Sequence, residues 1–194
     1  MTHSRLGKQF VQMSGEFGVT SELYRRGIQA SLTYGNSKSA DVVVFSEAGS
    51  RAARVEVKSA SIRSWIVGKQ ALLAAPHIVW VFVFMPSPAD TLSPAQVAEN
   101  GLASPRYFIL DSLGVKQLYE RKLEEAKKKK AKKLSDAEMI EIESAQGEYL
   151  NPNKKTDTKT KPKRSPKDPM IVFFYSDLQN EYNRWDRVET ALKK

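Results

Sequence analysis

"SADVVVFSEAGSRAARVEVKSAS" (residues 39–61) has the pattern of a β-hairpin and decides the fold class of this chain. Residues 41–47 form a β-branched run, residues 48–50 (Ala-Gly-Ser) are typical of a turn, and residues 54–60 alternate between apolar and polar. The two flanking segments are therefore predicted to be antiparallel strands. Charged residues stand inside both of these hydrophobic strands, so the pattern raises the question of what the charges do.

The spacing of these charges predicts that they meet on one face of the hairpin. If the turn is centred between Ala48 and Gly49, Asp41 faces Glu56 across the two strands, with Cβ atoms ~5 Å apart. Lys58 lies two residues beyond Glu56 and points to the same side of the sheet. A one-residue bulge would break this register, so the geometry depends on a regular hairpin.

Two carboxylates at this distance repel each other unless a proton or a cation lies between them. A divalent metal ion held by oxygen ligands satisfies that requirement. Asp41 and Glu56 are the candidate metal ligands, and the main-chain carbonyl of Val57 is a further one. Lys58 is a candidate for positioning an attacking water and for stabilising negative charge on a phosphate.

The segments around the hairpin predict an α/β core with a mixed sheet. An amphipathic helix is expected over residues 4–26, with Leu6, Phe10, Met13, Phe17, Leu23 and Tyr24 as its apolar positions and Gly27 as its stop. The further predicted elements are a strand at 28–34, a helix at 62–75, a buried strand at 77–86 and a strand at 106–112. The expected core order is therefore helix, three strands, helix, strand (αβββαβ), flanked by helices and followed by a basic C-terminal elaboration.

The chain is predicted to have three parts, a core at 1–125, a basic insertion at 126–169 and a closing segment at 170–194. A helix is expected to begin near Leu113 and to run into the lysine block at 127–133, and a capping box at 135–138 predicts a separate short helix beyond it. Residues 151–169 are polar, basic and proline-rich, and predict a partly disordered insertion. Residues 170–194 are expected to form a strand and a helix that dock on the core, because they would otherwise expose large aromatic side chains.

The composition excludes several kinds of site. The chain of 194 residues has no cysteine and only two histidines, which excludes disulfides, thiolate nucleophiles and a histidine-rich metal cluster. Any metal is then expected to be held by oxygen, as Mg²⁺ or Mn²⁺ is. A net charge of +9 is compatible with a polyanionic partner and equally with a lysine-rich solvated surface. The apolar run at 78–85 is too short for a membrane helix, and we expect a cytoplasmic protein without a membrane partner.

Asp41 followed by Glu56-Val57-Lys58, in adjacent strands after a helix that carries Glu16, resembles the PD-(D/E)XK nuclease superfamily. The resemblance covers roughly residues 8–85 and is closest to small Holliday-junction-resolvase-like members. It implies a restriction-endonuclease-like fold, Mg²⁺-dependent hydrolysis of DNA in which Mn²⁺ can substitute, and a homodimer. It also implies that Glu16 completes the acidic site as a metal ligand. Ala40 stands where the name of the superfamily has proline, at a position that varies widely among its members.

The expected function is that of a metal-dependent DNA endonuclease that acts on double-stranded or branched DNA. Two alternatives remain open, a non-catalytic nucleic-acid-binding or assembly protein with the same fold, and an RNA-cleaving relative. The candidate DNA contacts beyond the site are basic or polar residues near the hairpin and in the proline-rich segment. They are Arg54, Lys69, Gln70, Lys155, Lys161, Lys163 and Arg164.

Overall fold

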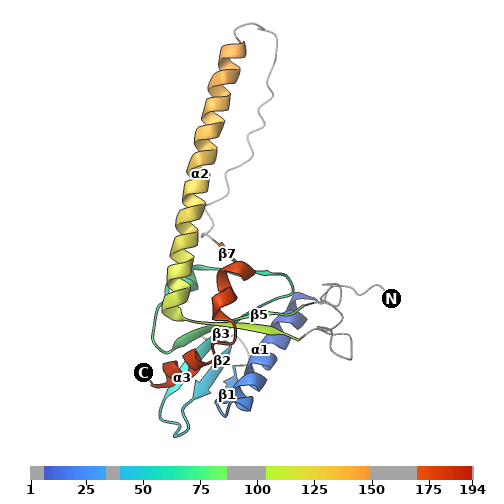
Figure 1. Cartoon of the computed structure of the whole chain (residues 1–194), viewed down its shortest axis with the longest axis vertical. Helices are drawn as coiled ribbons and strands as arrows, with labels where there is room; N and C mark the ends of the chain where they lie inside the picture. The colour runs from blue at the N-terminus through green and yellow to red at the C-terminus, as the bar shows by residue number, and fades with distance from the viewer. Residues whose placement is uncertain (1–6, 34–39, 87–103, 149–169, 194) are drawn as a thin grey trace, which may run out of the picture.

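The computed structural model describes residues 7–33, 40–86, 104–148 and 170–193, and over 133–148 it describes the main chain alone. A mixed five-stranded sheet forms its centre (Figure 1), which confirms the predicted α/β class. In spatial order the strands are β1 (Gln29–Leu32), β2 (Val42–Phe45), β3 (Ala52–Ala60), β5 (Ile78–Phe84) and β6 (Arg106–Asp111). The β3–β5 pair is parallel and the other pairs are antiparallel.

The central strand β5 separates two hydrophobic cores. All seven of its residues, IVWVFVF, are buried, as expected for a strand covered on both faces. Val79, Val81 and Val83 point into a core closed by helices α1 (Lys8–Arg25) and α3 (Asp186–Lys193). The alternate residues point into a second core, closed by helix α2 (Ser112–Glu148) and a small two-stranded sheet of β4 (Ser64–Val67) and β7 (Ile171–Phe174).

The prediction of a helix at 62–75 is wrong. That segment contains strand β4 and a short 3-10 helix, η1 (Lys69–Leu72). Trp65 and Val67 are buried while Ile66 is exposed, which is the period of a strand, and Gly68 separates the strand from the turn that follows. Strand β4 pairs with β7 from the far end of the chain, so a distant segment decides its structure.

Helix α1 ends as predicted but buries a different face. Gly27, with φ of +72°, terminates it, and the Ile28 N–H donates to the Leu23 carbonyl at 3.0 Å. Phe10 and Phe17, which we predicted to face the core, are exposed. The buried positions are instead Val11, Gly15, Glu16, Val19 and Leu23. The side that carries Gly15 faces the sheet because it allows the closest approach.

Helix α2 is one continuous helix, so the capping box at 135–138 does not start a second one. Asp111 caps its first turn, where Oδ1 accepts the Gly114 N–H at 2.7 Å. Ser112 Oγ donates to the Ala75 carbonyl at 2.6 Å and accepts the Ala75 N–H at 2.9 Å, which ties the η1 segment to α2. In the part of the chain that the structure describes, no helix has the length and apolarity needed to span a membrane.

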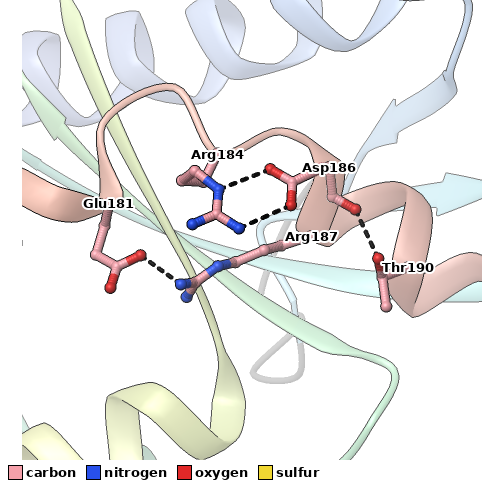
Figure 2. A network of polar contacts seen from close by, with 5 residues as sticks. All are labelled: Glu181, Arg184, Asp186, Arg187 and Thr190. Carbon is pink, nitrogen blue, oxygen red and sulfur yellow. Dashed lines mark hydrogen bonds and ion pairs between the residues drawn. The ribbon is translucent and has the colours of Figure 1, made fainter.

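The C-terminal elements lie on both faces of the body. After β7, a 3-10 helix η3 (Tyr175–Glu181) leads through Asn183, with φ of +55°, into α3. Figure 2 shows the polar network that holds this turn, in which Arg184 grips the Asp186 carboxylate with two hydrogen bonds of 3.0 Å and Arg187 pairs with Glu181. Trp185, just before α3, is buried in the core under α1.

Candidate functional site

The hairpin has the register predicted from the sequence. The β2–β3 ladder pairs Val42 with Val55 and continues to Phe45 opposite Ala52, without a bulge. Asp41 immediately precedes this ladder, and its N–H donates to the Val55 carbonyl at 3.2 Å. The half-buried Asp41 is therefore fixed at the point where β2 begins and where β3, still paired with β5, extends beyond β2 towards Ala60.

The Asp41 carboxylate is held by the main chain of β3. Its Oδ2 accepts the Val57 N–H at 2.7 Å. The Arg54 N–H and the Ala60 carbonyl form hydrogen bonds on the β5 side of β3. The main-chain groups of successive residues in a strand point to alternate sides, so those of Val57, an odd number of residues from both, point to the β2 side. The Val57 carbonyl thus lies on the same edge as Asp41, which is where a metal ligand was predicted.

Three charged residues of β3, Glu56, Lys58 and Arg54, lie at alternate positions of the strand. All three are half-buried and share one face of the strand, opposite to the buried Val55 and Val57. The neighbouring strand places Trp80 beside Glu56, and Lys58 Nζ lies 5.8 Å from the centre of the Trp80 ring. This cation–π contact gives the lysine stem an apolar wall and keeps its charge near the carboxylates.

Glu16 approaches from α1, which covers the other face of the sheet. Only 7% of this residue is exposed, which is unusual for a glutamate. Its Oε1 accepts a hydrogen bond of 3.0 Å from Gln12 Nε2, one helical turn earlier. The adjacent Gly15 lies directly against Ser59 of β3, so the position of Glu16 depends on this close contact between helix and strand.

The pKa values show that these groups share one electrostatic environment. Burial raises the pKa of the Glu56 carboxyl, the Asp41 charge raises it further, and Lys58 and Arg54 oppose the rise. Burial also raises the pKa of Glu16, the hydrogen bond from Gln12 opposes this, Asp41 adds to the rise, and Lys58 opposes it. Asp41 and Lys58 thus act on both glutamates. Such perturbed carboxyl groups are a frequent feature of functional sites.

We expect Glu56→Gln to stabilise the protein at neutral pH. A raised pKa means that the folded state holds the proton more tightly, so stability falls as the pH rises from the ordinary glutamate pKa through the raised one. Glutamine removes the buried charge, so its stabilising effect should be largest at neutral pH and should shrink towards acid pH. Thermal unfolding from acid to neutral pH measures this difference. Glu47→Gln, an exposed substitution on the same hairpin, should show no such trend, and an equal trend in both variants would contradict the argument.

The candidate metal ligands do not form a large cluster of acidic side chains. Within the described residues there is no group of three or more His, Cys, Asp or Glu side chains that could hold a metal. Asp41, Glu56 and Glu16 are therefore not gathered into a three-carboxylate cage. Mg²⁺ is commonly bound through one or two carboxylates with water and substrate phosphate as its other ligands. Asp41, Glu56 and the Val57 carbonyl edge offer a set of that kind.

The weaker DNA-contact candidates fall in three places. Arg54 shares a face with Glu56 and contributes to its electrostatic field. Lys69 and Gln70 are exposed on η1, which packs against α2. The remaining candidates lie outside the described residues: Lys155, Lys161, Lys163 and Arg164.

Three residues of the site were missed by the sequence reasoning. Gln12 carries a readable signal, because it stands four residues before Glu16 and so on the same helix face. Gly15 carries another, since a glycine inside a helix suggests close packing. Trp80 has no local signal, because it meets Lys58 only through the parallel pairing of β3 with β5.

No protein-family model matches the chain, and neither a curated protein nor a solved structure was found that is similar to it. The assignment of a function therefore depends on the geometry of the hairpin and its neighbours.

Proposed function

We propose that the protein is a Mg²⁺-dependent nuclease of the PD-(D/E)XK type with a restriction-endonuclease-like fold, and that duplex DNA is its substrate. One observation carries the proposal: Asp41, Glu56 and Lys58 lie within one electrostatic environment where β3 extends beyond the start of β2. A solvated strand face would not need a glutamate beside Asp41 whose charged form is disfavoured by burial and by repulsion from Asp41.

Each residue has a distinct role in this proposal. Asp41 and Glu56 bind the metal ion, together with the Val57 carbonyl, and the Asp41 carboxylate is already oriented by the Val57 N–H. The bound ion would supply Lewis-acid stabilisation of the phosphate and a lower pKa for its water. Lys58, placed against Trp80, orients the attacking water and neutralises charge that develops on the phosphate. Glu16 supports the site from α1, where the charges of Asp41 and Lys58 act on it.

Metal binding and cleavage test this proposal in sequence. Titration with Mn²⁺ or Ca²⁺, followed by calorimetry, should show binding to the wild type and to Glu47→Gln, and none to the double variant Asp41→Asn, Glu56→Gln. Bound metal should also raise the melting temperature of the wild type, because an ion that binds only the folded state stabilises it. Cleavage of plasmid DNA with Mg²⁺ should follow the same order. A wild type that binds no metal, even with duplex DNA present, would disprove the proposal.

A non-catalytic nucleic-acid-binding protein is the second candidate. It is favoured by the fact that the described residues contain no three-carboxylate cluster. In that case the purified protein would bind duplex DNA with the same affinity with and without Mg²⁺, and no metal would produce cleavage. A homodimer, which the superfamily resemblance implies, is part of the nuclease proposal and is tested by sedimentation of the same preparations.

A further inference from the structure

A ring of lysine side chains surrounds α2 just beyond the point where this helix leaves the body. Its members, which we call the lysine ring, are Lys127, Lys128, Lys129, Lys130 and Lys132. Consecutive residues of an α-helix are ~100° apart, so four lysines in succession point to all sides of the helix. Every one of them is exposed. The charge is thus distributed around a cylinder and not along one amphipathic face.

The part of α2 that precedes the lysine ring is firmly anchored to the body. Leu118 and Tyr119 are buried in the core beneath α2. Lys122 Nζ pairs with Asp177 Oδ1 at 2.7 Å, with only 17% and 13% of the two side chains exposed, and lies 5.5 Å from the Phe174 ring. From residue 124 to 132 every side chain is exposed, and Figure 1 shows α2 projecting away from the sheets. The anchor therefore fixes the direction in which the ring is presented.

Among the side chains that the structure describes, few acids compensate the charge of the lysine ring. Among the described side chains it makes one ion pair, between Lys127 Nζ and Glu124 Oε1 at 2.6 Å. Like charges one turn apart destabilise an exposed helix. An α-helix that nevertheless carries five lysines within six residues gains stability from a polyanion, which replaces repulsion with attraction and releases bound counterions.

We propose that the lysine ring lies in the major groove of duplex DNA and contacts the phosphates on both of its walls. The major groove of B-form DNA is ~12 Å wide and admits one α-helix. A helix in this groove has phosphates on two opposite sides, which suits charges that point all round, whereas a single strand would engage one side only. The A-form major groove of duplex RNA is too deep and narrow for such a helix. Because lysine contacts to phosphate carry no sequence information, this binding should be independent of sequence.

The partner class in this inference rests on the proposed nuclease function. Helix α2 packs over the core that contains Trp80, and Glu56 is paired with Trp80 on that same face of the sheet. The anchored part of α2 and the candidate active site therefore lie on one side of the sheet, so that a single DNA duplex would contact both the lysine ring and the site. The ring would add affinity and direction, while the hairpin would carry out the hydrolysis.

The test compares two five-fold variants of the full chain, in which the ring lysines are replaced by glutamine or by arginine. Both residues have helix propensities close to that of lysine, so circular dichroism should show equal helix content. Duplex binding is measured by fluorescence anisotropy at several KCl concentrations, with Ca²⁺ in place of Mg²⁺. The glutamine variant should lose about 4 to 5 units of the slope of log K against log salt, and roughly a hundredfold or more in affinity at low salt. The arginine variant should bind as the wild type does.

Three results would overturn the inference. The first is an unchanged salt slope in the glutamine variant. The second is equal dependence on the ring for duplex RNA, which would exclude the groove. The third is a change of oligomeric state in sedimentation without a change in DNA affinity, which would make the ring a self-association surface. Cleavage activity separates this inference from the nuclease proposal. If DNA binding depends on the ring but the protein never cuts DNA, only the nuclease proposal is refuted. If the protein cuts DNA but the glutamine variant has an unchanged salt slope, only the inference about the ring is refuted.

Discussion

Asp41→Asn is expected to lower the rate of Mg²⁺-dependent DNA cleavage at least about 10³-fold while leaving duplex binding intact, since the loss of a metal-binding charge removes several kcal/mol of transition-state stabilisation. The asparagine Oδ1 can still accept the Val57 N–H that the Asp41 carboxylate accepts at 2.7 Å, so the hairpin should keep its shape. Single-turnover cleavage of a labelled duplex measures the rate, and anisotropy in Ca²⁺ measures binding.

The matched control for this prediction is Glu47→Gln, which removes one carboxylate charge from the same hairpin at an exposed position. It should retain the wild-type cleavage rate. If Asp41→Asn cuts DNA as fast as this control, the hairpin is not the catalytic site and Asp41 is only a structural acceptor for the Val57 amide. If both variants cut DNA equally slowly, the effect comes from the loss of negative charge on the hairpin and not from Asp41 itself.

The second large effect is expected from Gly15→Ala, which should lower the free energy of unfolding by about 2 to 3 kcal/mol. A Cβ atom at Gly15 would lie 1.7 Å from Ser59 Oγ and 2.8 Å from Ser59 Cβ, so helix α1 would have to move away from β3. That movement would also displace Glu16. Urea denaturation measures the stability, and Ser14→Ala, on the exposed side of the same turn, should stay within about 0.5 kcal/mol of the wild type.

A double-mutant cycle identifies the origin of this loss. Ser59→Gly removes both atoms that the new methyl group would meet, and the next neighbour, Val83 Cβ, is at an ordinary 3.7 Å. Gly15→Ala should therefore be less destabilising by about 1 to 3 kcal/mol when Ser59 is already glycine. Ser59→Ala alone should be close to neutral, because Ser59 Oγ is buried without a hydrogen-bond partner in the structure as described. Additive effects would show that the close approach of α1 to β3 is not what Gly15 provides.

Local patterns predicted the elements whose structure depends on neighbours in the sequence. The hairpin register follows from the turn at Gly49 and the alternation of β3, and the end of α1 follows from the left-handed conformation at Gly27. The buried strand β5 follows from its continuous apolar run. Residues 64–72 were misread because Trp65 and Ile66 also fit a helical period, and their strand structure depends on pairing with residues 171–174.

The candidate site likewise contains residues that local sequence patterns predicted and residues that they did not. Asp41, Glu56 and Lys58 could be found from spacing alone, because one turn and the two-residue period of a strand place them. The wall that Trp80 provides for Lys58 depends on a parallel strand pair, for which no short-range signal exists. The buried face of α1 was misjudged because large apolar side chains such as Phe10 and Phe17 were given more weight than the small Gly15, which permits the closest contact with the sheet.

The pairing of β4 with β7 has a consequence for synthesis of the protein on the ribosome. Trp65, Phe82 and Phe108 share one core with Ile171, Phe173 and Leu178, which are translated much later. Until residues 170–178 have left the exit tunnel, one face of the sheet lacks its cover, and large aromatic surfaces of the nascent chain remain open to water and to chaperones. The antiparallel hairpin and α1 can form early, so the residues of the candidate site should be ordered before the domain is able to close.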